Sequence, residues 1–368
     1  MSDGYPLLWI LIIPVLNSKK PERQGILAAM APEKRKKKKK SRLYLILFSE
    51  IVIILVIFLC IYVYDKMSKI HFVNSEDSNI QQNEVEIEGY RNIAFFGVDS
   101  RENALEKSTH SDTIIIASIN NKTKAVKLAS IYRDTYTNIP GEGYNKINAA
   151  YFKGGYSLAL STINTNFDLD IKEFVTVNFS AIVNVIDKLG GIELDITSSE
   201  LKYLNGYVRE LNRINGTQVK GLKSAGTQTV NGTQATAYAR IRYTKGGDFK
   251  RAERQRIVIQ KIFDKVKSSD VSTINSIVDD MLPQIYTNLS AADILDLVKD
   301  VLSYNIVNNT GFPFEKDAHN YKKVSYVFPI NLQDNVVRLH EFLFDEIGYI
   351  PSSTVMEYSS YVEGIRTQ

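Results

Sequence analysis

An unbroken apolar run is the feature that most limits how this chain can fold. Residues 43–64 read LYLILFSEIVIILVIFLCIYVY and contain a single charged side chain, Glu50. About 20 apolar residues are enough for a helix to span a bilayer. KRKKKKK at 34–40 comes just before the run, and positive charge stays on the cytoplasmic side of a membrane. The sequence therefore predicts a single-pass type II protein of the cell membrane, with the chain after Tyr64 outside the cell.

The predicted boundaries follow from this helix. They are a cytoplasmic segment at 1–42, the transmembrane helix at 43–64, a polar linker at 65–88, one extracellular domain at 89–350 and a C-terminal tail at 351–368. We interpret residues 1–30 as an extension upstream of a start at Met30. Cys60 is the only cysteine, so the exported part has no disulfide, which favours a Gram-positive surface over a eukaryotic secretory route.

Strand and helix patterns interleave through the exported part. Runs rich in β-branched and aromatic residues predict strands at 92–98, 113–119, 125–131, 173–179 and 191–196. Apolar periodicity and capping residues predict helices at 181–189, 248–267, 290–302 and 333–347. Asn-Asn-Lys-Thr at 120–123 is a turn signal that joins two of the strands into a hairpin. We therefore expect an α/β fold with a mixed central β-sheet flanked by helices.

An arginine-rich stretch at 238–255, YARIRYTKGGDFKRAERQ, carries the strongest chemical signal. If the start of the stretch is an extended strand, Arg240 and Arg242 point to the same side. Arg251 and Arg254 stand one helical turn apart and share a helix face. A solvated basic surface would explain an isolated pair. Four convergent guanidinium groups favour a phosphate or pyrophosphate ligand, whose oxygens match the planar arginine fork.

Two aspartates stand at predicted strand ends, where α/β proteins place ligands. Asp99 follows the first strand and Asp112 opens the next. Each alone fits a turn or a helix cap, whereas the pair beside phosphate oxygens predicts a site for Mg²⁺ or Mn²⁺. Asn148, in a loop that leads into a helix, is expected to point into the same site. We find no zinc-ligand spacing, no phosphate-binding glycine loop and no G-x-S-x-G elbow.

Six short motifs occur in a fixed order between residues 90 and 267. They are GVDSR at 97–101, SDT at 111–113, RDT at 133–135, INAAY at 147–151 with a following Gly-Gly, LGG at 189–191, and RIRY…GDFKRAERQ at 240–255. In this order they resemble the LytR-CpsA-Psr family of bacterial cell-envelope enzymes. The chain departs from the family's usual motifs at Tyr132, where proline is common, and at His110, where arginine is common.

The resemblance implies a mixed sheet flanked by helices, with a hydrophobic tunnel for a carrier lipid. It implies transfer of a glycopolymer from a polyprenyl-pyrophosphate carrier to peptidoglycan, with release of polyprenyl phosphate. Carried onto this chain, Asp99 and Asp112 would hold the metal ion. The other implied site residues are Arg101, Arg133, Asn148, Arg240, Arg242, Asp248, Arg251, Arg254 and Gln255. Helices 181–189 and 257–266 are candidates for the tunnel walls.

Three hypotheses about function remain at this stage. A transferase needs a base for the acceptor hydroxyl, and either Asp134 or Asp248 fits. A non-catalytic, membrane-anchored receptor for lipid-linked or wall glycopolymers would need the arginines but not the metal ion. A transcriptional regulator would need a cytoplasmic DNA-binding module, for which 1–42 is too short. The lysine run is better explained by membrane topology than by nucleic-acid binding, so no nucleic-acid partner is expected.

Overall fold

The computed structural model describes residues 52–58, 60–73, 79–98, 105–106 and 109–368. The chain divides into two compact units, residues 1–61 and residues 62–368. In the first unit, residues 52–58 and 60–61 are helical. Within the described ranges, no helix is long and apolar enough to cross a membrane. The predicted span at 43–64 falls partly outside these ranges, so it stays a prediction.

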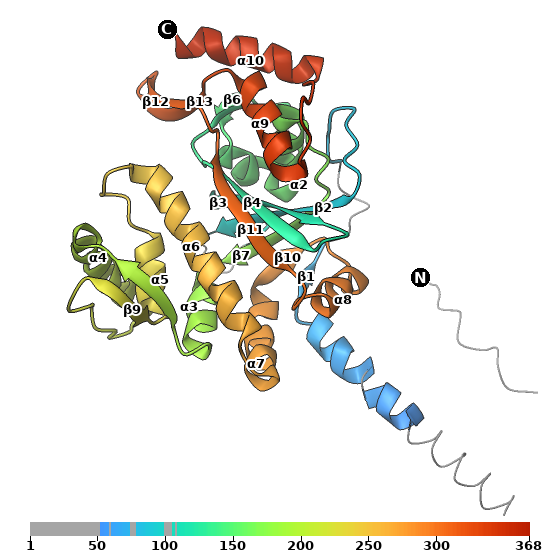
Figure 1. The fold of residues 1–368 in the computed structure, drawn as a ribbon, viewed down its shortest axis with the longest axis vertical. Coiled ribbons are helices and arrows are strands. Elements are labelled where there is room, and N and C mark those ends of the chain that lie inside the picture. Colours follow the sequence, from blue (N-terminus) through green and yellow to red (C-terminus); the bar gives the residue numbers. More distant parts are fainter. Residues whose placement is uncertain (1–51, 59, 74–78, 99–104, 107–108) are drawn as a thin grey trace, which may run out of the picture. The chain divides into compact units, whose positions relative to one another are not determined.

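The second unit is built on a seven-stranded mixed sheet (Figure 1). In spatial order its strands are β1 (His71–Phe72), β10 (Ile285–Thr287), β7 (Glu173–Asn178), β2 (Tyr90–Val98), β3 (Ser111–Asn120), β4 (Ala125–Ile131) and β11 (Asn305–Phe312). The β1–β10, β7–β2 and β4–β11 pairs are parallel, and the other neighbours are antiparallel. The predicted hairpin is the β3–β4 pair, and Asn120 Oδ1 accepts two backbone hydrogen bonds in its turn. The predicted mixed sheet is confirmed.

Helices cover both faces of the sheet. On one face lie α2 (Asn148–Phe167), α9 (Leu332–Phe344) and α10 (Ser353–Arg366); on the other lie α6 (Gly247–Lys267) and α8 (Ala291–Lys299). Successive side chains of β3 point to opposite faces and enter different cores. Ile114 and Ile116 pack toward α2, whereas Ile115 packs toward α6. The first core is the larger, and its buried side chains reach from the sheet to α2, α9 and α10.

A smaller layer with its own core packs beside α6. It contains α3 (Phe179–Lys188), β8 (Ile192–Ile196), α4 (Ser198–Asn215), β9 (Gly226–Val230) and α5 (Gly232–Ala239). The predicted strand at 191–196 forms, but it pairs with β9 and not with the central sheet. Helices α3 and α5 approach closely at Gly232, where an added Cβ would lie 2.1 Å from the Val183 carbonyl oxygen. Only glycine fits there without a shift of backbone.

The remaining elements are short. They are β5 (Tyr136–Ile139), β6 (Gly143–Lys146), α7 (Val271–Met281), the 3-10 helix η2 (Leu282–Gln284), β12 (Lys316–Tyr321) and β13 (Val324–Pro329). Strands β5 and β6 form one hairpin, and β12 and β13 form another.

Three predicted segments differ in the structure. The expected strand at Arg240–Arg242 is absent, because a capping box between Asn231 and Gln234 starts α5 and the helix runs to Ala239. The expected tail at 351–368 contains α10, whose buried Val355 and Val362 pack on the domain. The expected linker at 65–88 contributes β1, and its Gln81 and Asn83 donate hydrogen bonds to residues of α2.

Candidate functional site

The β3–β4 hairpin brings two of the predicted residues together. Asp112 lies at the start of β3, and Arg133 follows the end of β4, so both stand at the same end of the hairpin. Arg133 Nη1 donates a hydrogen bond to Asp112 Oδ1. Arg133 Nε also lies 3.8 Å from Asp134 Oδ2. The sequence grouped these residues by motif, and the antiparallel pairing explains their contact.

Helix α6 adds its first turn to this pair. Arg251 Nη2 donates to Asp248 Oδ2 over 3.0 Å and to the Asp112 carbonyl oxygen over 3.4 Å. The guanidinium groups of Arg133 and Arg242 lie 3.9 Å and 3.7 Å from the Asp248 carboxylate. Asp248 therefore faces three arginines. We call Asp112, Arg133, Asp134, Arg242, Asp248 and Arg251 the charged cluster.

The charged cluster has three arginines and three aspartates, but its hydrogen-bond donors are incompletely matched. Burial lowers the pKa of Arg251 to about 10, and the repulsion from Arg133 and Arg242 acts in the same direction. Burial also opposes the charge of Arg133, but Asp112, Asp134 and Asp248 outweigh it and raise the pKa of Arg133. Among the described residues, the buried Nε atoms of Arg133 and Arg251 have no hydrogen-bond partner. Both guanidinium groups therefore retain a donor for an anionic ligand.

Two cavities adjoin the charged cluster. A cleft of about 570 Å³ is lined by Thr109, His110, Asp112, Arg133, Asp134, Lys146 and Asn148. A smaller cavity between β3, β4 and α6 is lined by residues that include Asp248, Arg251 and Gln255. Asn148 and Gln255 thus lie beside the charged cluster, and their contact with a ligand stays a prediction. His110 stacks on Phe152 with 4.7 Å between ring centroids.

Sequence reasoning missed Lys146 as a site residue. Its Nζ lies 3.0 Å from Asp134 Oδ1, and the side chain lines the large cleft. The available signal was its position directly before the INAAY motif, at the entry to α2. Lys146 adds a second kind of cation to the cleft, a mobile point charge beside the planar guanidinium of Arg133.

Two arginines that the sequence assigned to the site, Arg240 and Arg254, contact residues outside the charged cluster. Arg254 is buried, and it donates to Glu200 Oε1 over 2.7 Å, to the Ile241 carbonyl over 3.0 Å and to Thr244 Oγ1 over 2.7 Å. These bonds tie α6 to α4 and to the segment after α5. Arg240 Nη2 lies 3.6 Å from Glu210 Oε1 of α4. Their predicted contacts with a ligand stay predictions.

Asp99 and Arg101 lie outside the described residues, so the predicted metal pair is represented only by Asp112. In the described part of the chain, no three His, Cys, Asp or Glu side chains are grouped closely enough to hold a metal ion by themselves. Asp112 engages Arg133 through Oδ1 alone. A cation at this carboxylate would need further oxygen ligands, such as those of a bound phosphate.

The unusual Tyr132 is explained by packing. Its ring lies edge-on to Phe249 of α6, with 4.6 Å between centroids, and burial raises its pKa. The ring closely approaches Gly311 of β11, where an added Cβ would lie 2.1 Å from the hydroxyl oxygen. Tyr132 thus fixes the turn that carries Arg133 between α6 and the sheet.

The helices expected to form the tunnel walls pack on neighbouring elements. In α3, Val185 and Leu189 pack against Ile277 of α7. Ile186 of α3 and Val258 of α6 belong to the core of the smaller layer. These side chains are covered by described neighbours, and the tunnel stays a prediction.

Comparisons with known proteins agree with this architecture. A model of the LytR_cpsA_psr family matches residues 57–338. The polyisoprenyl-teichoic acid–peptidoglycan teichoic acid transferase TagT of Bacillus subtilis is 31% identical over 239 residues, which cover 63% of this chain and 71% of TagT. The transferase TagU of Enterococcus faecalis is 31% identical over 243 residues, covering 63% of this chain and 74% of TagU.

A solved structure shares the fold. It is the LytR-CPS2A-psr family protein YwtF (TagT) with bound octaprenyl pyrophosphate lipid, and it matches with a TM-score of 0.52 and 25% sequence identity. The match covers 74% of this chain and 99% of that one. From the order of its motifs, its mixed sheet and the extent of the family match, the chain belongs to the LytR-CpsA-Psr family.

Proposed function

We propose that this chain is a membrane-anchored phosphotransferase that moves a glycopolymer from a polyprenyl-pyrophosphate carrier to peptidoglycan and releases polyprenyl phosphate. The polymer is a teichoic acid or a capsular or other wall polysaccharide. TagT and TagU are named as transferases of this kind, and a related structure holds octaprenyl pyrophosphate. The observation that carries the proposal is the surplus of buried guanidinium donors at Arg133 and Arg251 beside a cleft.

A pyrophosphate group fits the charges of this site. Its oxygens can accept hydrogen bonds from the Nε–H groups of Arg133 and Arg251, which have no hydrogen-bond partner among the described residues. Its negative charge also offsets the repulsion among the three arginines around Asp248. Fixed cations in a partly buried site stabilise charge that develops on transferring phosphoryl oxygens. The arginines therefore stabilise the transition state as well as the bound donor.

The reaction is a substitution at the phosphorus that carries the polymer. The acceptor sugar hydroxyl oxygen bonds to this phosphorus, the bond to the bridging oxygen breaks, and polyprenyl phosphate leaves with that oxygen. The hydroxyl proton passes to a carboxylate base. Asp134 is better placed for this role than Asp248, because it lines the large cleft whereas Asp248 lines the smaller cavity among three arginines.

Mg²⁺ or Mn²⁺ is the cofactor we propose for this site. The carboxylate of Asp112 fits a hard cation, since only its Oδ1 takes part in the described ion pair. Asp99, which lies outside the described residues, would be the second protein ligand. When bound, the cation would neutralise charge on pyrophosphate oxygens. Asp112 would then serve two neighbours at once, the cation and Arg133.

The proposed anchor is the apolar run at 43–64, with the domain outside the cell and the lysine run inside. This location brings the domain to the carrier lipid and to peptidoglycan. Protease added to intact protoplasts should remove the domain, and complete protection there would contradict this topology.

Transfer in vitro tests the proposed reaction. The full chain, a lipid-pyrophosphate glycopolymer donor and peptidoglycan should yield bound polymer and polyprenyl phosphate in equal amounts. The reaction should stop in EDTA and resume with added Mg²⁺. A receptor for lipid-linked or wall glycopolymers would instead bind the donor equally well with or without the metal and would release no polyprenyl phosphate.

A further inference from the structure

A pair of stacked aromatic rings stands at the wall of the large cleft. The rings of His110 and Phe152 are nearly parallel, with 10° between their planes and 4.7 Å between their centroids. His110 is exposed and lines the cleft. Phe152 is 44% exposed, whereas its neighbour Tyr151 is fully buried. The aromatic pair, as we call His110 and Phe152, is therefore a flat surface that the described part of the domain leaves partly open.

The first turn of α2 carries Phe152 on the side of the cleft. Asn148 lines the cleft, and Phe152 follows four residues later, so the two side chains share a helix face. The backbone at 154–155 is not helical, and this kink separates the first turn from the rest of α2. Lys153 forms an ion pair with Glu142, which lies in the turn between β5 and β6. Contacts of its own therefore hold the first turn in place.

The same turn is bonded to the segment that carries the proposed base. The backbone N–H of Ile147 donates to the Thr135 carbonyl oxygen over 2.9 Å, and that of Asn148 donates to the Arg133 carbonyl oxygen over 3.2 Å. Asp134 lies between these two acceptors in the chain and lines the cleft together with Asn148. The aromatic pair and the proposed base therefore adjoin the same cleft, on segments that backbone hydrogen bonds join.

The lining of the large cleft combines the two kinds of group that a sugar ring needs. A pyranose has an apolar face of C–H groups, which packs on an aromatic ring, and a rim of hydroxyls, which exchange hydrogen bonds with carboxylate, amide and ammonium groups. Asp134, Lys146 and Asn148 supply those polar groups beside the aromatic pair. The volume of about 570 Å³ lies within the range of roughly 300–1,000 Å³ that is usual for small-molecule sites.

The charges of this cleft suit a neutral ligand. Asp134 and Lys146 are the side chains of fixed charge that line this cleft but not the smaller cavity, and they pair with each other over 3.0 Å. The buried Nε donors of Arg133 and Arg251, by contrast, have no partner among the described residues, and Arg251 lines the smaller cavity. The anionic donor of the proposed reaction therefore fits the arginines, and an uncharged sugar fits the large cleft.

The two cavities meet at the ion pair of Asp112 and Arg133, which lines both of them. The smaller cavity is bounded by α6 and the large cleft by the start of α2, and these helices cover opposite faces of the sheet. In phosphoryl transfer the attacking and leaving oxygens lie roughly in line, on opposite sides of the phosphorus. With the leaving phosphate at Arg251, the acceptor hydroxyl thus approaches from the large cleft.

We propose that the large cleft is the acceptor subsite, and that a pyranose ring of the peptidoglycan glycan strand stacks on the aromatic pair. This inference rests on the proposed function, because it assigns a place to the acceptor of that reaction. Stacking fixes the plane of the sugar ring and so directs one hydroxyl toward Asp134. His110 and Phe152 are thus acceptor-binding residues, and the donor is held without them.

Binding of a lipid-free peptidoglycan oligosaccharide tests this assignment without turnover. Calorimetric titrations compare the full chain in detergent micelles with Phe152→Ala and with Phe152→Tyr, which keeps the aromatic ring. Phe72→Ala is the matched control, because Phe72 is 42% exposed and lies on β1, outside the lining of both cavities. Each protein is also titrated with a polyprenyl pyrophosphate that carries no polymer, with and without the oligosaccharide. Thermal unfolding checks the fold, and His110→Ala replaces Phe152→Ala if the latter unfolds.

We expect Phe152→Ala to raise the Kd for the oligosaccharide about 10-fold, while Phe152→Tyr and Phe72→Ala bind it as the wild type does. The Kd for polyprenyl pyrophosphate should be the same in all variants and should not rise when the oligosaccharide is present.

Equal oligosaccharide affinities in Phe152→Ala and the wild type would overturn the inference, and so would competition between the oligosaccharide and the lipid. A weaker affinity for the lipid alone in Phe152→Ala would overturn it in favour of a donor contact. These titrations do not depend on turnover. A wild-type chain that releases no polyprenyl phosphate in the transfer assay would therefore contradict the proposed function, while the oligosaccharide affinities would still decide the place of the sugar.

Discussion

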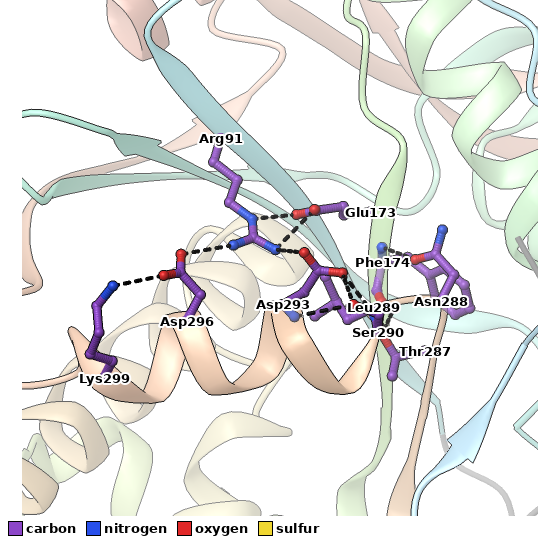
Figure 2. A network of polar contacts seen from close by, with 10 residues as sticks. All are labelled: Arg91, Glu173, Phe174, Thr287, Asn288, Leu289, Ser290, Asp293, Asp296 and Lys299. Atoms are coloured by element: carbon purple, nitrogen blue, oxygen red, sulfur yellow. Dashed lines mark hydrogen bonds and ion pairs between the residues drawn. The ribbon is translucent and has the colours of Figure 1, made fainter. Parts of the chain in front are cut away.

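Two clusters of arginine and carboxylate stand at opposite ends of the same sheet, and they differ in how completely their charges are matched. At one end, Arg91 makes two hydrogen bonds with Glu173 and lies near two aspartates of α8 (Figure 2). The hydrogen bonds that Arg91 donates to Glu173 outweigh burial and raise the pKa of Arg91. At the other end, burial and neighbouring arginines lower the pKa of Arg251 to about 10.

The difference separates a structural cluster from the proposed binding site. Around Arg91, carboxylates outnumber guanidinium groups, and Nε and Nη2 already make hydrogen bonds. In the charged cluster, three arginines share the Asp248 carboxylate, and two buried Nε donors have no partner among the described residues. Residue type alone does not distinguish the two places. The balance of donors and acceptors does, and it favours the charged cluster as the proposed binding site for an anion.

The largest effect should come from Arg133→Ala. Loss of this fixed cation should slow glycopolymer transfer by about 10²–10³-fold, with little change in thermal unfolding. Arg91→Ala is the matched control and should transfer at the wild-type rate per folded molecule. Equal transfer rates in the two variants would show that the two clusters do not differ in function.

Asp112→Asn and Asp293→Asn make the same comparison with carboxylates. Only the first should reduce metal-dependent transfer, on the order of 100-fold, because it removes a proposed cation ligand. Donor binding should persist through the arginines, as measured with a labelled lipid pyrophosphate. Full metal-dependent activity in Asp112→Asn would move the metal site elsewhere.

Arg254→Ala tests whether this arginine stabilises the fold or binds the ligand. Its removal leaves the buried Glu200 carboxylate without a cation, so the free energy of unfolding should fall by about 3–5 kcal/mol in denaturant titrations. An unchanged unfolding midpoint together with slower transfer would return Arg254 to the ligand-binding residues that the sequence predicted.

The ion pair between Arg254 and Glu200 also predicts that the stability of the fold depends on pH in the acidic range. Burial alone would raise the pKa of Glu200, but hydrogen bonds from Thr197 and Arg254 outweigh it and lower the pKa below the ordinary value of 4.5. A carboxylate with a lowered folded pKa stabilises the fold above its unfolded pKa, and this contribution is lost as the pH falls through the folded pKa. The wild type should therefore lose more stability than Arg254→Ala when the pH falls below about 4.5. Parallel stability profiles for the two proteins would show that Glu200 is not responsible.

The smallest effect should come from Arg91→Ala on stability. Its hydrogen bonds to Glu173 are charge-assisted but partly exposed, so we expect a loss of about 1–2 kcal/mol. Added salt should reduce the difference between variant and wild type in the same unfolding measurement. A loss as large as that of Arg254→Ala would show that solvent does not weaken this network.

The central strands were predictable because their signals are local. The strands at 92–98 and 125–131 are short β-branched runs beside clear turns, and α6 follows from apolar periodicity. The strand predicted at Arg240 and Arg242 failed because alternation in so short a segment competes with a helix that starts at a capping box upstream.

The site was harder to predict because its partners are distant in sequence. Asp112 and Arg251 both carry motif signals, yet only the fold reveals that the Asp112 carbonyl accepts from Arg251 across 139 positions. Arg254 shares the helix and the motif of Arg251, but its partner Glu200 lies 54 positions away in α4. No local pattern distinguishes the two arginines, so the sequence assigned both to the ligand.

A crystal structure of the chain with a polyprenyl pyrophosphate would show directly whether the charged cluster binds the donor. We expect diphosphate density within hydrogen-bond distance of the Arg133 and Arg251 guanidinium groups, with the Arg91 network unchanged. Density for the diphosphate at another place, with the ion pairs of Arg133 and Arg251 as they are here, would show that the charged cluster is not the donor site.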